Sequence, residues 1–72
     1  MNALLLEMKA KSQGKNNEYM AKLLHIDPAT YYRKRVGESE FTRKEMQIIR
    51  SELNLSADEF DSIFFDDVLT QT

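Results

Sequence analysis

The most chemically distinctive stretch of the 72-residue chain is Tyr31-Tyr32-Arg33-Lys34-Arg35, in which two aromatic residues precede three bases. Arginine presents a planar fork of N–H donors that matches a phosphate group or the O6 and N7 edge of guanine, whereas lysine offers a compact point charge. The alternative is a solvated surface, because exposed charges commonly contribute little beyond their own hydration. The stretch therefore predicts either contact with a polyanion or an ordinary exposed face.

Groups that carry catalysis or hold metal ions are scarce. The chain has no cysteine, a single histidine at position 25 and no glycine-rich phosphate loop. One imidazole cannot form a metal site alone, and the acids of the C-terminal part lack the Asp/Asn-Gly spacing of a calcium loop. We therefore expect no enzymatic activity, no cofactor and no metal, and we interpret His25 as a turn residue.

Charge is distributed unevenly, although the net charge is only −2. Residues 1–50 hold all ten Lys and Arg against six acids, a net +4, and residues 51–72 hold six acids and no base, a net −6. The basic part could face a polyanion while the acidic part points away. No apolar run approaches the roughly 20 residues of a membrane span, and no secretory leader is recognisable. We expect a cytoplasmic protein that does not enter a membrane.

Glycine, proline and helix-capping residues divide the chain into short amphipathic segments with no strand pattern. Asn16 or Asn17 is a good N-cap, and Asp27-Pro28 places a capping acid before a proline that needs no hydrogen-bond acceptor. Two capping boxes, each with a hydrophobic staple, are Thr42-x-x-Glu45 and Ser56-x-x-Glu59. The predicted helices cover residues 2–12, 16 or 17 up to His25, 28–36, 42–53 and 56–65, with 66–72 as a flexible acidic tail.

Apolar spacing predicts the inward face of each helix. In the first helix, Leu4 and Leu5 each pair with Met8 at helical spacing, which predicts an inward stripe. Adjacent tyrosines cannot share one face, so Tyr31 is expected in the core and Tyr32 at the surface. The segment 16–37 then contains two helices of about eight residues joined by a three-residue turn, an arrangement that holds the helices at a steep angle.

This segment resembles the helix-turn-helix of the Cro/phage-repressor family, also called the XRE family. The matching features are Met20-Ala21-x-Leu23-Leu24, Ile26, Asp27 and Thr30-Tyr31, followed by Glu40-Phe41-Thr42-x-x-Glu45, Leu53-Asn54-Leu55-Ser56-x-x-Glu59 and Ile63-Phe64-Phe65. The resemblance extends from about Leu4 to Phe65. It departs from the family at His25, where glycine is usual, at Lys34, where an apolar residue is usual, and at Asp27, which replaces Ser or Thr.

The resemblance implies an all-α, five-helix, lambda-repressor-like domain over residues 1–65 whose third helix reads the major groove of DNA. It implies a sequence-specific transcriptional regulator similar to a phage repressor or Cro protein. The base-reading face would include Arg33 at a guanine edge and Ala29 at a thymine methyl. The DNA-binding residues implied are Asn17, Pro28, Ala29, Thr30, Tyr32, Arg33 and Val36, with Lys34, Arg35, Arg43 and Lys44 at phosphates and the N-terminus of the helix after Thr42 beside a phosphate.

The expected partners are a double-stranded DNA operator and a second copy of the chain. A homodimer would bind half-sites about 34 Å apart. Apolar residues near the C-terminus exceed what one helix face needs, so some belong to the core and some could form the dimer contact, the candidates being Phe60, Ile63, Phe64, Phe65 and Leu69. The alternative function is a protein-interaction module, antitoxin-like or anti-repressor-like, that docks through residues 60–69 and does not read DNA.

Overall fold

The computed structural model describes residues 1–65, and the tail predicted at 66–72, with Leu69, lies outside the described residues. The described part consists of five helices and contains no strand, which confirms the all-α prediction. The helices are α1 (Ala3–Ser12), α2 (Asn17–Leu24), α3 (Pro28–Arg35), α4 (Arg43–Leu53) and α5 (Ala57–Phe64). Among these residues, none of the helices combines the length and the apolarity needed to cross a membrane.

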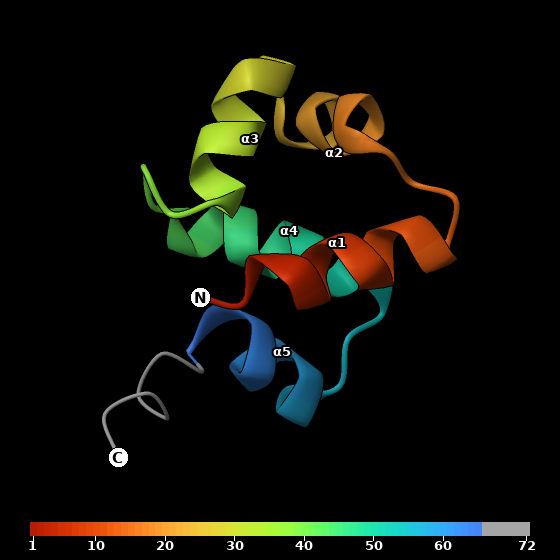
Figure 1. The fold of residues 1–72 in the computed structure, drawn as a ribbon. Coiled ribbons are helices and arrows are strands. Elements are labelled where there is room, and N and C mark those ends of the chain that lie inside the picture. Colours follow the sequence, from red (N-terminus) through yellow and green to blue (C-terminus); the bar gives the residue numbers. More distant parts are fainter. Residues whose placement is uncertain (66–72) are drawn as a thin grey trace.

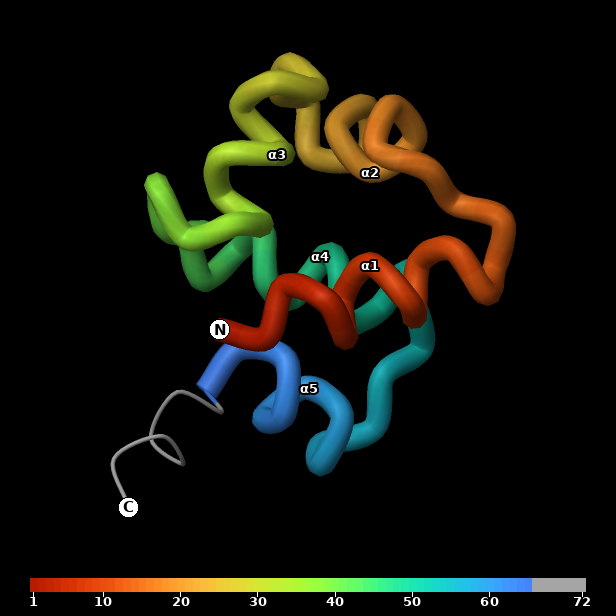
Figure 2. The backbone as a smooth tube through the Cα atoms, in the orientation of Figure 1, coloured from red at the N-terminus to blue at the C-terminus, as the bar shows by residue number. Residues whose placement is uncertain are grey.

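The helices α1 and α4 occupy the middle of the molecule, with α2 and α3 on one side of them and α5 on the other (Figure 1). Helix α3 packs mainly against α2 and crosses it steeply. The backbone trace shows the N-terminus meeting the end of α5 (Figure 2), where the Asn2 amide donates a 2.6 Å hydrogen bond to the Ile63 carbonyl. The acidic helix α5 therefore lies away from α3.

Local capping sets most helix starts. The side-chain oxygens of Asn2 and Asn16 accept from the backbone amides of Leu5 and Tyr19, at 3.0 and 2.9 Å. Both predicted capping boxes are confirmed, at Thr42 with Glu45 and at Ser56 with Glu59. Each cap satisfies amides that have no acceptor inside the helix.

Helix α3 begins differently from the prediction. Asp27 occupies the N-cap position with extended backbone, but its side chain makes no capping hydrogen bond in the described structure. The start of α3 instead coincides with Pro28, whose fixed φ suits the first helical position. The expectation that the Asp27 carboxylate caps the helix is therefore wrong, although the helix starts where predicted.

The turn between α2 and α3 depends on a left-handed residue. His25 has φ 60° and ψ 41°, and its amide donates to the Lys22 carbonyl while the Ile26 amide donates to the Ala21 carbonyl. A left-handed backbone favours glycine, but histidine tolerates it better than most residues do. His25 is a turn residue, as predicted, and it reverses the chain within three residues.

The core is continuous across all five helices and contains Leu6, Met20, Tyr31, Ile49, Leu53 and Ile63 among its fully buried side chains. A chain of aromatic contacts extends it from α3 to α5: Tyr31 to Phe41 at 5.9 Å, Phe41 to Phe64 at 5.8 Å and Phe64 to Phe60 at 5.0 Å between ring centroids. Tyr31 is therefore a core residue, and the small side chain of Ala21 is also buried, as predicted.

The inward face of α1 differs from the prediction. Leu4 and Met8 are 66% and 57% exposed, whereas Leu6 and Ala10 are buried. Three consecutive leucines at positions 4–6 make the apolar register of this helix ambiguous. The small Ala10, four residues after Leu6, marks the face that packs against the core.

Candidate nucleic-acid interface

Helix α3 has an exposed side and a side that packs against the protein, and pairs of residues along its sequence belong to each side in turn. Pro28, Ala29, Tyr32, Arg33 and Val36 are exposed and follow the spacing of one helical face. We call these five residues the outward stripe. The intervening pairs, 30–31 and 34–35, are buried or half-buried. Tyr32 is 49% exposed, as predicted, and the structure brings the predicted base-reading residues together on one accessible surface.

Arg35 is not the exposed phosphate ligand that the sequence analysis predicted. It is only 7% exposed, and its Nη1 lies 3.2 Å from the Glu7 Oε1 on α1. Its guanidinium also stacks over the Tyr32 ring at 5.4 Å. Because Arg35 follows Tyr31 by four residues, it falls on the inward side of α3, where its charge joins α3 to α1.

Lys34 also departs from its predicted role. Its Nζ lies 2.7 Å from the Glu45 Oε1 at the start of α4, and both side chains are mostly buried. Lys34 occupies an inward position, at which the sequence resemblance had led us to expect an apolar residue. An ion pair thus links α3 to α4, and the Lys34 charge is already neutralised within the protein. Thr30, another predicted DNA contact, is half-buried on the same side.

The remaining predicted contacts lie in the first turns of α2 and α4 and at the N-cap of α4. Asn17 is exposed in the first turn of α2, next to the capping Asn16. Thr42, Arg43 and Lys44 are exposed at the start of α4. These residues present two helix N-termini and two cations, which are groups that suit backbone phosphates.

Among residues 1–65, ion pairs neutralise five of the ten cations, and they also connect the basic and acidic parts of the chain. The Lys9 Nζ lies 2.6 Å from the Glu59 Oε2, and the Lys15 Nζ lies 3.3 Å from the Glu52 Oε2. Lys9 therefore joins α1 to α5, and Lys15 joins the α1–α2 connection to α4. These two lysines of the basic part are therefore engaged with acids of the C-terminal part and are not available to a polyanion.

On α2, on α3 and in the first turn of α4, four cations have no ion-pair partner within residues 1–65: Lys22, Arg33, Arg43 and Lys44. Lys22 was not singled out from the sequence, yet it lines a shallow groove together with Ile26 and Pro28, beside the start of α3. Lys22 could have been found from the sequence, because it lies four residues after Glu18 and so shares with it the exposed side of α2. Within the stretch 17–44, which holds these cations, four acids also lack an ion-pair partner among residues 1–65: Glu18, Asp27, Glu38 and Glu40.

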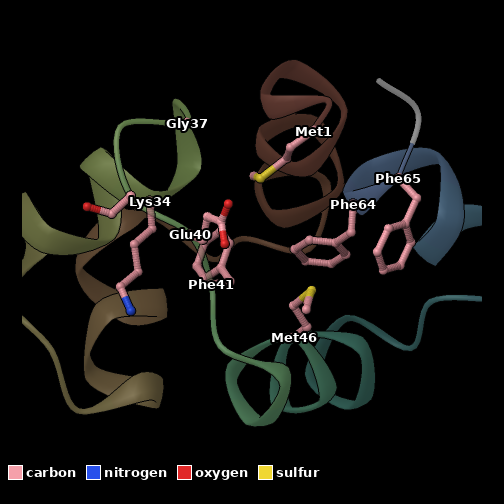
Figure 3. A pocket seen from close by; sticks show the side chains of 9 residues that line it. Met1, Lys34, Gly37, Glu40, Phe41, Met46, Phe64 and Phe65 are labelled. Atoms are coloured by element: carbon pink, nitrogen blue, oxygen red, sulfur yellow. The ribbon is translucent and has the colours of Figure 1, made fainter. Parts of the chain in front are cut away.

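A cavity of about 420 Å³ lies at the other end of α3, between the segment before α4 and the end of α5. Phe41, Met46 and Phe64 line it together with Met1, and Figure 3 shows these side chains arriving from separate elements. The lining is largely apolar at one end, with Lys34 and Glu40 at the other.

Two of the predicted dimer contacts are core residues. Ile63 is fully buried and Phe64 is 9% exposed, because the inward face of α5 packs into the domain. Phe60 is half-buried against the core beneath the Arg50 guanidinium, at 5.3 Å, and Phe65 is 50% exposed. Only Phe60 and Phe65 among the described candidates have surface to offer a second copy. No cluster of His, Asp or Glu suited to a metal ion occurs among residues 1–65.

Comparisons with protein-family models, with curated proteins and with solved structures found no match to this chain.

Proposed function

We propose that this protein is a sequence-specific DNA-binding transcriptional regulator of the Cro/phage-repressor kind, in which α2 and α3 act as a helix-turn-helix. In this function the outward stripe of α3 enters the major groove, and the regulator acts in the cytoplasm on a double-stranded operator. The observation that carries the proposal is that all five residues of the outward stripe, on α3 and at its C-cap, are exposed, while the inward side of α3 is fixed by Tyr31, Lys34 and Arg35.

The surroundings of α3 suit DNA. Arg33 has no ion-pair partner in the described structure, so its fork is available for a guanine edge. Arg43 and Lys44, together with the N-terminus of α4, can contact phosphates, as can Asn17 at the start of α2. Lys22 adds a cation beside Pro28. The acidic residues Asp58 and Asp61 are on α5, on the far side of the molecule from α3.

The size of α3 favours a dimer on the operator. Eight helical residues span about 12 Å, so one α3 helix can contact only one half-site of an operator. Two copies related by a two-fold axis would place their α3 helices in successive major grooves about 34 Å apart. Phe60 and Phe65 are the described residues that could contribute to the contact between copies.

The direct test is a fluorescence-anisotropy titration of the full chain with a random duplex at low salt, followed by selection of bound sequences from a random DNA pool. We expect binding that weakens steeply with salt and a selected motif with two related half-sites. Absence of binding to any duplex at low salt would contradict the proposal.

A second candidate function is a protein-interaction module on the same fold. The equal numbers of unpaired acids and cations around α3, together with the exposed Tyr32 and Val36, favour this alternative, because a polypeptide partner can satisfy both signs of charge. If this alternative is correct, the duplex titration will show no binding, and substitutions at Tyr32 and Val36 will abolish association with a protein partner.

A further inference from the structure

A cavity of about 290 Å³ lies between α1, α2 and α3, with charged side chains in its wall. Its wall comprises the second half of α1, the first turn of α2, and Tyr31 and Arg35 from the inward side of α3. This volume is at the lower end of the range for ligand cavities, which suits a small ion or metabolite. The Tyr31 hydroxyl and the Arg35 Nε, both from the inward side of α3, have no hydrogen-bond partner among residues 1–65.

Tyr31 contributes a donor to this cavity. The residue is 1% exposed, lines the cavity and has no hydrogen-bond partner for its hydroxyl among residues 1–65. The hydroxyl is not one of the fully enclosed polar atoms that lack a partner in the described structure, so it opens onto the cavity. Burial of the ring raises the pKa of Tyr31 to about 12, so the hydroxyl keeps its proton and can donate to an acceptor bound there.

Arg35 contributes a second set of donors. Its Nη1 donates to Glu7, but its Nε is buried without an acceptor in the described structure. Glu7 is shared, because the Lys11 Nζ also lies 3.1 Å from its other carboxylate oxygen. The guanidinium is therefore a buried cation whose hydrogen-bonding capacity is only partly used.

The first turn of α2 makes the cavity more favourable to negative charge. The amides of Asn17 and Glu18 have no acceptor inside the helix, and the positive end of the α2 dipole lies there. The wall contains three cations, Lys11, Lys15 and Arg35, against two acids, Glu7 and Glu18, and Lys15 is also paired with Glu52. These charges balance, so the preference for an anion comes from the α2 dipole and from the Tyr31 and Arg35 donors.

We propose that this cavity binds a small oxyanion, either inorganic phosphate or the phosphate or carboxylate group of a metabolite, through the Tyr31 hydroxyl and the Arg35 guanidinium. An oxyanion supplies acceptors only, which is what the donors require. Because both residues belong to the inward side of α3, the bound anion holds α3 against α1 and α2. A phosphate of the DNA backbone has the same chemistry, so the test separates the two sources.

The test is a titration of inorganic phosphate into the ¹⁵N-labelled full chain, with sodium chloride at matched ionic strength as the reference. We expect saturable amide shifts at Asn17, Glu18 and Tyr31 that chloride does not produce. Tyr31→Phe should weaken phosphate binding about ten- to a hundredfold, the loss of one hydrogen bond to a charged group. Tyr32→Phe, which removes the same hydroxyl from the neighbouring exposed ring, should leave the affinity unchanged.

A parallel titration with a short duplex identifies the source of the anion. Weaker phosphate binding by Tyr31→Phe with unaltered duplex binding indicates a small-molecule site, and weaker duplex binding indicates a phosphate of the DNA backbone. The proposal is overturned if phosphate causes no more shift than chloride, or if Tyr31→Phe and Tyr32→Phe, both folded by their spectra, bind phosphate equally. The phosphate titration does not depend on whether the protein binds DNA, so its failure is separate from failure of the regulator proposal.

Discussion

Arg33 and Arg35 lie two positions apart on α3 but have different surroundings. Arg33 is exposed on the outward stripe, whereas Arg35 is buried between Glu7 and the Tyr32 ring. The same side chain is therefore free at the surface at one position and holds α3 against α1 at the other. Substitutions at the two arginines should separate DNA binding from stability.

Arg33→Ala should weaken binding to the selected operator by about 1–3 kcal/mol and relax the preference at one base pair. The stability of the variant in urea should not change, since Arg33 makes no buried contact among the described residues. Arg50→Ala is the matched control, because Arg50 is a cation over Phe60 on the α5 side of the molecule. Equal weakening on all sequences would identify Arg33 as a phosphate contact instead.

Lys44→Ala should act differently on the same operator. Loss of a phosphate contact weakens binding to specific and random duplexes alike, and lowers the slope of log affinity against log salt by about one. Anisotropy titrations at four salt concentrations would measure both effects. An unchanged slope would exclude Lys44 from the interface.

Arg35→Ala should lower the free energy of unfolding by about 1–3 kcal/mol, because it removes a buried stem and leaves Glu7 without one of its cations. Arg35→Met should be considerably milder, since an apolar residue of similar volume can replace a buried ion pair with little loss. Urea denaturation of both variants measures the difference. Equal destabilisation would show that charge, rather than packing, is what Arg35 contributes.

At the scale of the elements, the N-caps of α3 and α4 offer a matched comparison. Thr42 accepts a 3.1 Å hydrogen bond from the Glu45 amide in a complete capping box, whereas the Asp27 side chain makes no such bond in the described structure. Thr42→Ala should therefore cost about 1 kcal/mol of stability, and Asp27→Ala should cost distinctly less. Thermal or urea unfolding tests this order, and a larger loss for Asp27→Ala would contradict it.

The helices could be predicted from the sequence because their signals are local. Capping boxes, Pro28 and the left-handed His25 act within a few residues, so all five helices were located to within about one residue. The inward register of α1 could not be predicted, because Leu4, Leu5 and Leu6 are equally apolar and only the distant packing surface distinguishes them. For the candidate site, the helical period correctly predicts a buried Tyr31 and an exposed Tyr32. The same period puts Lys34 and Arg35 on the inward side, but their positive charge led to the wrong prediction that they are exposed phosphate contacts.

The partners of those two cations could not be deduced from the sequence. Glu7 is 28 residues from Arg35 in the chain, and Glu45 is 11 residues from Lys34, so the pairs form only once the helices have packed. The same holds for Lys9 with Glu59. Electrostatic contacts between elements depend on tertiary structure, whereas the outward stripe follows from the period of one helix.

At the scale of the whole molecule, these ion pairs make stability depend on pH. Hydrogen bonds from Lys11, Tyr19 and Lys9 lower the pKa values of the carboxyl groups of Glu7, Glu52 and Glu59, respectively, from their ordinary value of 4.5. Burial raises the pKa of Glu45, but its bonds to Lys34 and Thr42 outweigh that effect, so this pKa is also lowered.

A carboxyl group whose pKa is lower in the folded state stabilises the fold above its unfolded pKa, and this contribution is lost as pH falls through the folded value. The melting temperature should therefore be nearly constant from pH 7 to about 5 and should fall below about pH 4.5. Circular dichroism melts across this range provide the measurement. Glu59→Gln should show a shallower decline, and a melting temperature independent of pH down to 3 would contradict the expectation.

The separation of α3 into two sides has a consequence for how such a protein can change over time. Ala29, Arg33 and Val36 face away from every helix that the inward side contacts, so new residues there alter what the surface recognises without disturbing the packing beneath. A lineage built on this scaffold could acquire new targets by a few substitutions at these positions. The pairs that join α3 to Glu7 and Glu45 would meanwhile stay under selection for holding the helix in place.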